Sequence, residues 1–265
     1  MNKTLFAKEL RANLFVSGII AAVLALYIGM IISMFDPELG ESLDLMMQSM
    51  PEVFAAFGMS TQTTTLIDFM LNYLYGFLLT AFVLVLVLIM ANKLMVRHLD
   101  RGSMAYLLAT PTSRVRIAGT MIGVMTTVLA ALAVLVTALE MGFAETLFPG
   151  ELDFEALAWV NAGLLALWLA MAASCFLSAC LFSNAAAALW TGGGLWILFF
   201  LMQMVSQVDD DFELLESINP LTLFDYYGLA ASDASAAWGA AALAVSAVAL
   251  FTAAVTVFTR RDLSV

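Results

Sequence analysis

Few residues of this chain are of the types that carry chemistry, and they form no catalytic pattern. The only histidine, His98, lies beside Arg97 in a basic stretch. Cys175 and Cys180 share one apolar run, five residues apart, and are expected to be packing residues and not a disulfide. The sequence contains no HExxH, no Cys/His cluster, no glycine-elbow serine and no Walker lysine. The chain is therefore predicted to be no enzyme, and to hold no metal or other cofactor of its own.

Neutral polar residues within apolar runs are the remaining candidates. They are Asn72, Tyr73, Tyr75, Thr80, Asn161, Ser174, Ser178, Thr191 and Gln203. Such side chains either line a substrate path or form hydrogen bonds between helices, and the second role is favoured for most of them. Asp68 and Glu140 are expected at the outer ends of their runs. The runs are then predicted to lack the deeply buried carboxylates that ion-coupled transporters use.

The elements that must position these residues are membrane spans. Hydrophobic residues make up 63% of the chain and charged residues 12%, which is far from the balance of a soluble domain. A span needs about 20 apolar residues. The predicted spans are residues 14–35, 69–91, 117–139, 156–182, 185–205 and 236–258. We therefore expect an all-α, polytopic membrane protein with one transmembrane domain over residues 1–265.

The fourth and fifth spans come from one long uncharged stretch, residues 156–205. As a single helix it would be about 75 Å long, which is far more than a bilayer core requires. A turn at Ser183-Asn184 is the expected break. Ser183 and Asn184 carry no charge. This turn is therefore placed on the inner side only because an even number of predicted spans precedes it.

The basic residues fix the expected orientation. All ten lie in three stretches, before the first span, between the second and third, and after the last. Only three of the 21 acidic residues share these stretches: Glu9, Asp100 and Asp262. Cytoplasmic loops favour Lys and Arg during insertion. We therefore expect a multi-pass protein of the plasma membrane with both termini in the cytoplasm, and no nucleic-acid partner.

Segments outside the spans also carry patterns. The N-terminal segment places Phe6, Leu10 and Leu14 on one face, with Lys8 and Arg11 turned away. This pattern indicates either an amphipathic helix on the inner leaflet or a plain basic flank. The outer loops, residues 36–67 and 206–234, resemble amphipathic caps on the outer leaflet. Their run Asp209-Asp210-Asp211 is read as a solvated helix start in preference to a cation site.

The inner loop 98–117 has the most informative pattern. Asp100 can cap a short helix, which must end before Pro111 because the residue before a proline disfavours the helical region. Its apolar side would carry Met104, Leu107 and Leu108. Thr112 or Ser113 can cap the next helix. A free helix of this length is marginal in water, so it either packs on a partner or folds back onto the membrane.

This loop resembles the coupling region of permeases of the type-2 ATP-binding-cassette (ABC) exporter family, which often show an acidic residue and then G-[ST]-x-x-x-L-L-[AS]-x-P-x-S-R. The matching residues are Asp100, Gly102, Ser103, Leu107, Leu108, Ala109, Pro111, Ser113 and Arg114. Asp100 stands where the family more often has Glu. Lys8-Glu9-Leu10 is similar to the family's N-terminal elbow helix, and the sequence from Phe258 to Asp262 is similar to its terminal F-x-x-R-D.

The resemblance implies a permease subunit that works with a separate ATPase, which binds ATP and Mg²⁺, and with a second permease copy, identical or related. The implied ATPase-coupling residues are Asp100, Gly102, Ser103, Met104, Leu107, Leu108, Pro111 and Arg114. The implied elbow helix comprises Phe6, Lys8, Glu9, Leu10 and Arg11. The family's second and fifth spans face the central cavity, which indicates Asn72, Tyr75, Thr191 and Gln203 as the substrate path.

The neutral spans favour an amphiphilic or apolar substrate, such as a drug, an antimicrobial peptide or a lipid-like molecule. The direction of transport comes from the resemblance alone. The alternative is a membrane anchor or sensor that recruits an ATPase and transports nothing.

Overall fold

The computed structural model describes residues 2–35, 49–50, 65–96, 112–182, 184–206 and 218–261. Every regular element in these ranges is helical. The long elements are α1 (Lys3–Ser33), α5 (Leu78–Ala91), α8 (Arg114–Leu147), α9 (Phe154–Leu181), α10 (Ala185–Ser206) and α13 (Ala234–Arg260). The short ones are α4 (Leu66–Met70), η1 (Leu71–Tyr75), η2 (Asn92–Val96), η4 (Pro220–Leu223) and α12 (Tyr226–Ala230). With α4, η1, α5 and η2 taken as one continuous span, six helices are long and apolar enough to cross a membrane.

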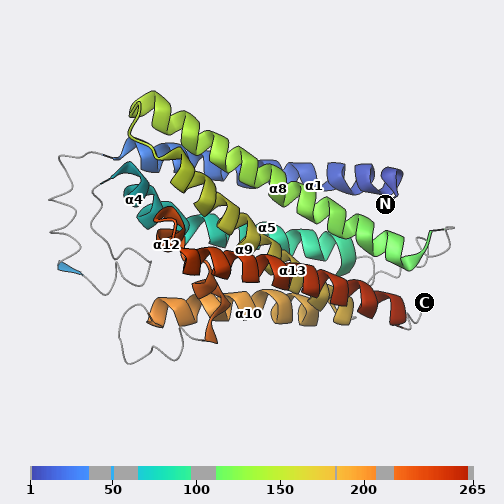
Figure 1. Cartoon of the computed structure of the whole chain (residues 1–265). Coiled ribbons are helices and arrows are strands. Elements are labelled where there is room, and N and C mark those ends of the chain that lie inside the picture. The colour runs from blue at the N-terminus through green and yellow to red at the C-terminus, as the bar shows by residue number, and fades with distance from the viewer. Residues whose placement is uncertain are drawn as a thin grey trace.

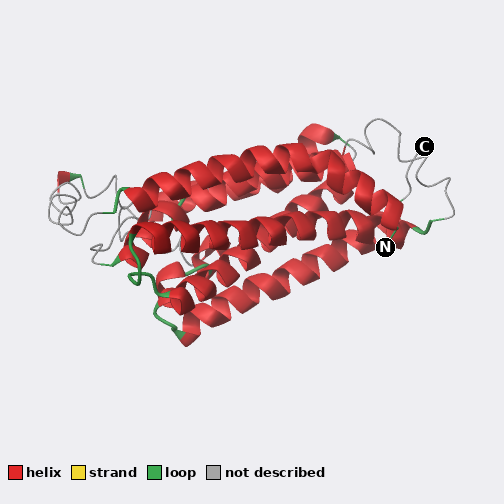
Figure 2. Cartoon of the chain, turned by 90° about the horizontal axis from the view of Figure 1, so that it is seen from above, coloured by secondary structure: helices red, strands yellow, loops and turns green. Residues whose placement is uncertain are grey.

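The six long helices run roughly parallel and antiparallel as one elongated bundle (Figures 1 and 2). α9 is the central helix: it packs against α13, α10, α5 and α8, and 72% of its most apolar segment is buried by protein. α1 lies against α8 on one side of the bundle (Figure 1). α10 and α13 are peripheral, with 28% and 22% of their most apolar segments buried, so most of their side chains are left for lipid.

The helices are longer than the predicted spans. Apolar composition shows only which residues lie in the membrane, whereas a helix ends where a capping residue satisfies its backbone groups. Side chains of Ser113, Asp153 and Asp233 accept hydrogen bonds from backbone N–H groups in the first turns of α8, α9 and α13. Ser113 is one of the two predicted caps. The expected break between the fourth and fifth spans is confirmed, since α9 ends at Leu181 and α10 begins at Ala185.

The expected elbow helix is not a separate element. Residues 3–33 form one continuous helix, because no proline or glycine interrupts its first turns before Gly18. The face toward α8 also differs from the predicted one. Leu5, Glu9 and Asn13 are buried, whereas Leu14, which was predicted on the apolar face, is 55% exposed.

The second span is the irregular one. Its α-helical parts are interrupted by a π-helical turn, η1, and by a turn at Gly76-Phe77, and η2 at its far end is also π-helical. Single π-helical turns inside longer helices are rare and often mark functional positions. Here η1 directs Asn72 and Tyr75 into the protein, where both are buried.

Glycine sets how closely α10 approaches the centre. A Cβ on Gly192 would meet the Cα of Cys175 at 3.0 Å, and a Cβ on Gly193 would meet the side chain of Leu88 at 2.5 Å. The absence of a side chain therefore lets α10 contact the backbone of α9, which is the close packing expected of small residues between membrane helices. Cys175 and Cys180 are both free and buried.

The two ends of the bundle differ in charge. The described Lys and Arg residues lie at the end that holds both termini in Figure 1, which we call the basic end: Lys3, Lys8, Arg11, Lys93, Arg114, Arg116, Arg260 and Arg261. The described Asp and Glu residues other than Glu9 lie toward the opposite, acidic end: Asp68, Glu140, Glu145, Glu151, Asp153, Glu155, Asp225 and Asp233.

Candidate functional sites at the two ends of the bundle

Arginine side chains hold three helices together at the basic end. Arg114, in the first turn of α8, donates from Nη1 to the backbone carbonyl of Arg261 at 2.7 Å. Arg261, just after α13, donates from its own Nη1 to the carbonyl of Cys180 in α9, also at 2.7 Å. These charged donors satisfy carbonyls that a helix leaves unpaired in its last turn. The start of α8 and the ends of α9 and α13 are thereby fixed to one another.

The start of α1 joins the same assembly. The backbone N–H of Asn2 donates to the Thr120 hydroxyl of α8 at 3.0 Å, and the Asn2 side chain caps α1 by accepting from Thr4 and Leu5. Among the implied elbow residues, Glu9 is buried and forms an ion pair with Lys8 at 3.8 Å, and Phe6 and Leu10 are half-buried. Arg11 is exposed. These residues therefore belong to the first turns of a span.

The implied coupling residues lie between the end of η2 and the start of α8. Asp100, Gly102, Ser103, Met104, Leu107, Leu108 and Pro111 lie outside the described residues, as does His98. Arg114 is described, and its guanidinium bonds to the protein's own backbone as given above. The undescribed stretch is residues 97–111, and the elements on either side of it, the end of the second span and the start of α8, lie at the basic end with the two termini (Figure 1).

The acidic end contains a carboxylate whose burial the sequence did not predict. Glu140 was expected at the outer end of its span, but α8 continues to Leu147, about 10 Å farther along the helix. Its side chain is 0% exposed. The Tyr75 hydroxyl donates to its two oxygens at 2.9 and 3.0 Å, and Asn161 Nδ2 donates to Oε2 at 2.8 Å. The sequence did not predict this burial by protein, although Glu140 still lies toward the acidic end of α8, seven residues before its last residue.

The network continues toward the outer segment. The Tyr227 hydroxyl of α12 donates to Asn72 Oδ1, and the ring of Tyr226 stacks on Tyr75 with centroids 6.5 Å apart. Burial raises the pKa of Tyr226 well above its ordinary value, so its hydroxyl stays neutral. We call Asn72, Tyr75, Glu140, Asn161 and Tyr227 the polar layer. It joins the second span, α8, α9 and α12 at one level.

The donors around Glu140 are all neutral. Within the described part of the chain no Lys or Arg forms an ion pair with it, and no group of three metal-ligating side chains occurs. A buried carboxyl group in such surroundings can exchange a proton or attract a cationic group, because an unpaired charge is costly at low dielectric. It does not form a metal centre by itself.

The structure separates the four predicted path residues. Asn72 and Tyr75 lie in the polar layer, while Thr191 is exposed on α10 and donates to its own helix at Ala187. Gln203 is half-buried near the other end of α10. Other polar residues do connect helices, as predicted for most of them: Trp196 donates to Ser174 at 2.7 Å, and Ser178 donates to the carbonyl of Ala188 at 2.8 Å.

One feature of the sequence could have indicated that Glu140 lies inside a helix and not at its end. The apolar residues Met141, Phe143 and Ala144 follow it without a break, so the helical pattern continues past the predicted end of the span at residue 139. Its partners had no such signal. Tyr75 lies 65 residues away and Asn161 lies 21 residues away, so their meeting depends on the packing of three helices.

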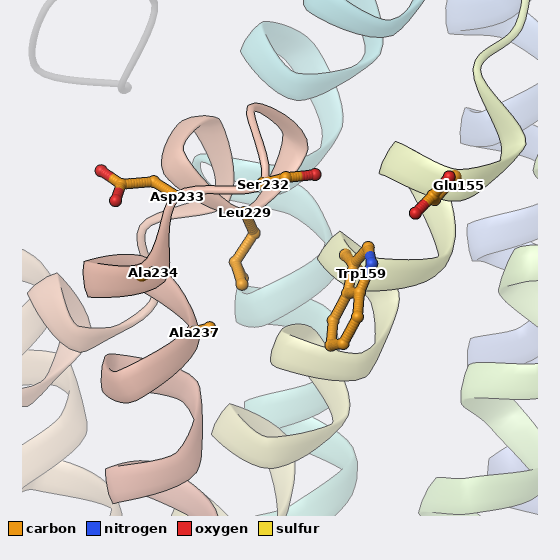
Figure 3. A pocket seen from close by; sticks show the side chains of 7 residues that line it. All are labelled: Glu155, Trp159, Leu229, Ser232, Asp233, Ala234 and Ala237. Carbon is orange, nitrogen blue, oxygen red and sulfur yellow. The ribbon is translucent and has the colours of Figure 1, made fainter.

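Two hollows lie near the polar layer. One, of about 280 Å³, is at the acidic end, where Glu155 and Trp159 of α9 face the turn between α12 and α13 (Figure 3). Asp233 caps α13 and its carboxylate points away from Trp159 in this view, so the two acidic residues of this hollow form no pair (Figure 3). The other is a groove of about 440 Å³ between α8 and α9, with Asn161 in its lining.

Comparisons with protein-family models, with curated proteins and with solved structures find no match to this chain.

Proposed function

We propose that this protein is the membrane permease subunit of an exporter driven by a separate ATPase, with the basic end in the cytoplasm. One observation carries the proposal: the loop between the second and third spans has the coupling pattern, and the elements beside it lie at the same end of the bundle. These elements are the starts of α1 and α8 and the end of α13 (Figure 1).

The hydrogen bonds at the basic end support a mechanical role for this loop. A coupling helix that a motor moves must transmit its displacement to the spans and not bend alone. The loop continues directly into α8, which Arg114 ties to Arg261, and Arg261 ties to α9. Because α9 is the central helix, a displacement of the start of α8 would reach the middle of the bundle. The motor supplies ATP and Mg²⁺ binding, and the permease supplies the path.

The proposed cargo is amphiphilic or apolar. The peripheral helices α10 and α13 expose large apolar side chains, such as Trp190, Leu201 and Val245, which suits contact with lipid and with a second permease copy. A cargo that dissolves in the bilayer could reach the bundle laterally. This part of the proposal depends on the surface being apolar, which lipid contact alone also requires.

A double substitution tests the coupling. Leu107→Asp with Leu108→Asp places two charges on the apolar side of the loop, where a partner's groove would have to bury them. The parent chain is first co-expressed with candidate ATPases from neighbouring genes, and for any ATPase that co-purifies with it we expect the double variant to lose that association while inserting normally into the membrane. The matched control is Val134→Asp with Leu135→Asp, an exposed pair in the middle of α8 that should impair insertion instead. Unchanged ATPase association in the loop variant would refute the coupling role.

Topology and turnover complete the test. Single cysteines at residues 105 and 231, introduced into a variant in which Cys175 and Cys180 are Ala, should be labelled from opposite sides of the membrane. Labelling of both from one side would refute the orientation. In reconstituted complex, stimulation of ATP hydrolysis by amphiphilic cargo is expected of an exporter, whereas a non-transporting anchor predicts unchanged turnover with every candidate cargo.

A further inference from the structure

The groove between α8 and α9 is built from small side chains at helical spacing. Ala130, Ala133 and Ala138 line it from α8, and Ala158 and Ala162 line it from α9. These positions recur three to five residues apart, so they share one face of each helix. Because alanine leaves the backbones close to the surface, a hollow of about 440 Å³ remains open along the two helices.

Asn161, which lines this groove, carries a hydrogen-bond acceptor without a partner in the described part of the chain. Asn161 is only 6% exposed, and its Nδ2 is occupied by Glu140 at 2.8 Å. Its Oδ1 is buried and has no partner in the described part of the chain. Nearly all buried polar atoms in proteins are paired, and an unpaired one costs free energy. Thr137 of the same lining does not supply the missing donor, since its hydroxyl bonds to Ala133 of its own helix.

The depth of Asn161 suits a polar headgroup. It lies eight residues into α9, whose 28 residues are about 42 Å long, against a hydrocarbon core of about 30 Å. If the helix is centred, Asn161 is about 6 Å inside the core from the acidic end. From this level the groove continues toward the basic end past Ala133, Ala130 and Leu165, which are all apolar.

These observations define the chemistry of the occupant. An occupant that reaches the unpaired amide oxygen of Asn161 must supply an N–H or O–H donor, and the apolar walls require a hydrocarbon chain. When the carboxyl group of Glu140, which accepts from Nδ2 of the same amide, is ionised, it favours a positively charged occupant over one with a neutral hydroxyl. We propose that this groove binds an alkylammonium amphiphile, whose N–H donates to Asn161 Oδ1 and whose chain lies along α8 and α9.

Equilibrium binding of radiolabelled dodecylamine to the purified full chain in nanodiscs tests this, with empty nanodiscs subtracted. We expect saturable binding at one site per chain. Dodecyltrimethylammonium has the charge and the chain but no N–H, so it should compete at least about tenfold less well. Dodecanol has a donor without the charge and should also compete less well than unlabelled dodecylamine.

A matched pair of variants locates the site. Ala162→Phe fills the groove, and Ala244→Phe places the same ring on the exposed face of α13. Both alanines are exposed to lipid, so both variants should elute and melt like the parent chain. We expect Ala162→Phe to weaken dodecylamine binding by at least about tenfold, which a filled pocket requires, and Ala244→Phe to leave it unchanged.

Three outcomes would overturn the proposal: absence of saturable binding, equal competition by dodecyltrimethylammonium, or unchanged binding in Ala162→Phe. If the parent chain is a dimer and the Ala162→Phe variant is a monomer that still binds dodecylamine equally well, the groove is an interface between two copies of the chain. The assay uses this chain alone. Its failure would therefore leave the ATPase-driven permease proposal standing, and loss of that proposal would leave the binding site standing.

Discussion

The two ends of the bundle are held together by opposite means. At the basic end, exposed or half-buried arginines donate to backbone carbonyls, so the charges stay near the surface and each bond satisfies a helix terminus. At the acidic end, the carboxyl group of Glu140 is fully buried and its partners are side chains from two other helices.

This difference has an energetic consequence. Removing a basic-end donor lets water reach the freed carbonyl, whereas removing a member of the polar layer leaves other buried polar atoms unpaired. The acidic end should therefore be the less tolerant of substitution. The basic end should tolerate small displacements, which suits an end that a motor is proposed to move.

The largest effect is expected at Glu140. Glu140→Leu leaves the Tyr75 hydroxyl and Asn161 Nδ2 without their acceptor and should destabilise the protein by about 3 kcal/mol. Glu140→Gln keeps one acceptor oxygen and the side-chain volume, so about 1 kcal/mol is expected. Reversible unfolding in mixed micelles measures both. Equal stability of the two variants would mean that the polar layer is not a stabilising network.

The next largest effects are expected at glycines that lie against the backbone of another segment. A Cβ on Gly239 would collide with the backbone carbonyl of Leu223, which cannot move as a side chain can. Gly239→Ala should therefore cost about 2 kcal/mol, and Gly192→Ala, whose Cβ would meet the Cα of Cys175 at 3.0 Å, somewhat less. Gly142→Ala is the control, since nothing lies within 4 Å of its added Cβ. The same unfolding assay ranks the three, and a neutral Gly239→Ala would contradict the close approach.

The basic end should respond more weakly. Arg261→Ala removes the hydrogen bond to Cys180 and should cost about 1 kcal/mol, because the freed carbonyl is near water. Thermal unfolding in micelles should show a smaller loss for this variant than for Glu140→Leu. A larger loss of stability for Arg261→Ala than for Glu140→Leu would contradict the expectation that the acidic end tolerates substitution less well. Retained stability with loss of cargo-stimulated ATP hydrolysis would indicate that this contact serves transmission of movement.

The smallest effect is expected at the cap of α13. The backbone N–H and hydroxyl of Ser235 lower the pKa of Asp233 below its ordinary value. A lowered pKa means that the charged cap stabilises the folded state above the ordinary carboxyl range and that this contribution is lost as pH falls through the lowered pKa. Asp233→Ala should therefore be slightly less stable than the parent at neutral pH and equal to it in strong acid. A constant difference at all pH values would exclude this linkage.

The number and extent of the helices were largely predictable. The uncharged stretch 156–205 had to be two spans because a bilayer core is about 30 Å thick, and the break lies between Leu181 and Ala185 as expected. The helix ends were less predictable from apolar composition, which marks only the membrane. Caps such as Ser113 and Asp153 were better guides to them, because a capping side chain satisfies backbone groups wherever the lipid ends.

The candidate sites were predictable only in part. Asn72, Tyr75 and Asn161 were recognised as polar residues in spans, but their arrangement was not. The burial of Glu140 was not predicted, because it depends on donors from other helices, which no local pattern reveals. The predicted elbow helix is unconfirmed, since the backbone continues its hydrogen bonds without interruption from Lys3 into the first span.

The sequence by itself determined six apolar helices and the confinement of basic residues to one end, because helix formation in lipid and insertion follow from the composition of each segment. Only the tertiary structure decided that Tyr75 and Asn161 meet the carboxyl group of Glu140, and that Asn161, whose amide oxygen is unpaired in the described part of the chain, lines a groove between α8 and α9. These features arise where helices distant in the chain pack together, and the energy of each contact depends on what the neighbouring helix places opposite it.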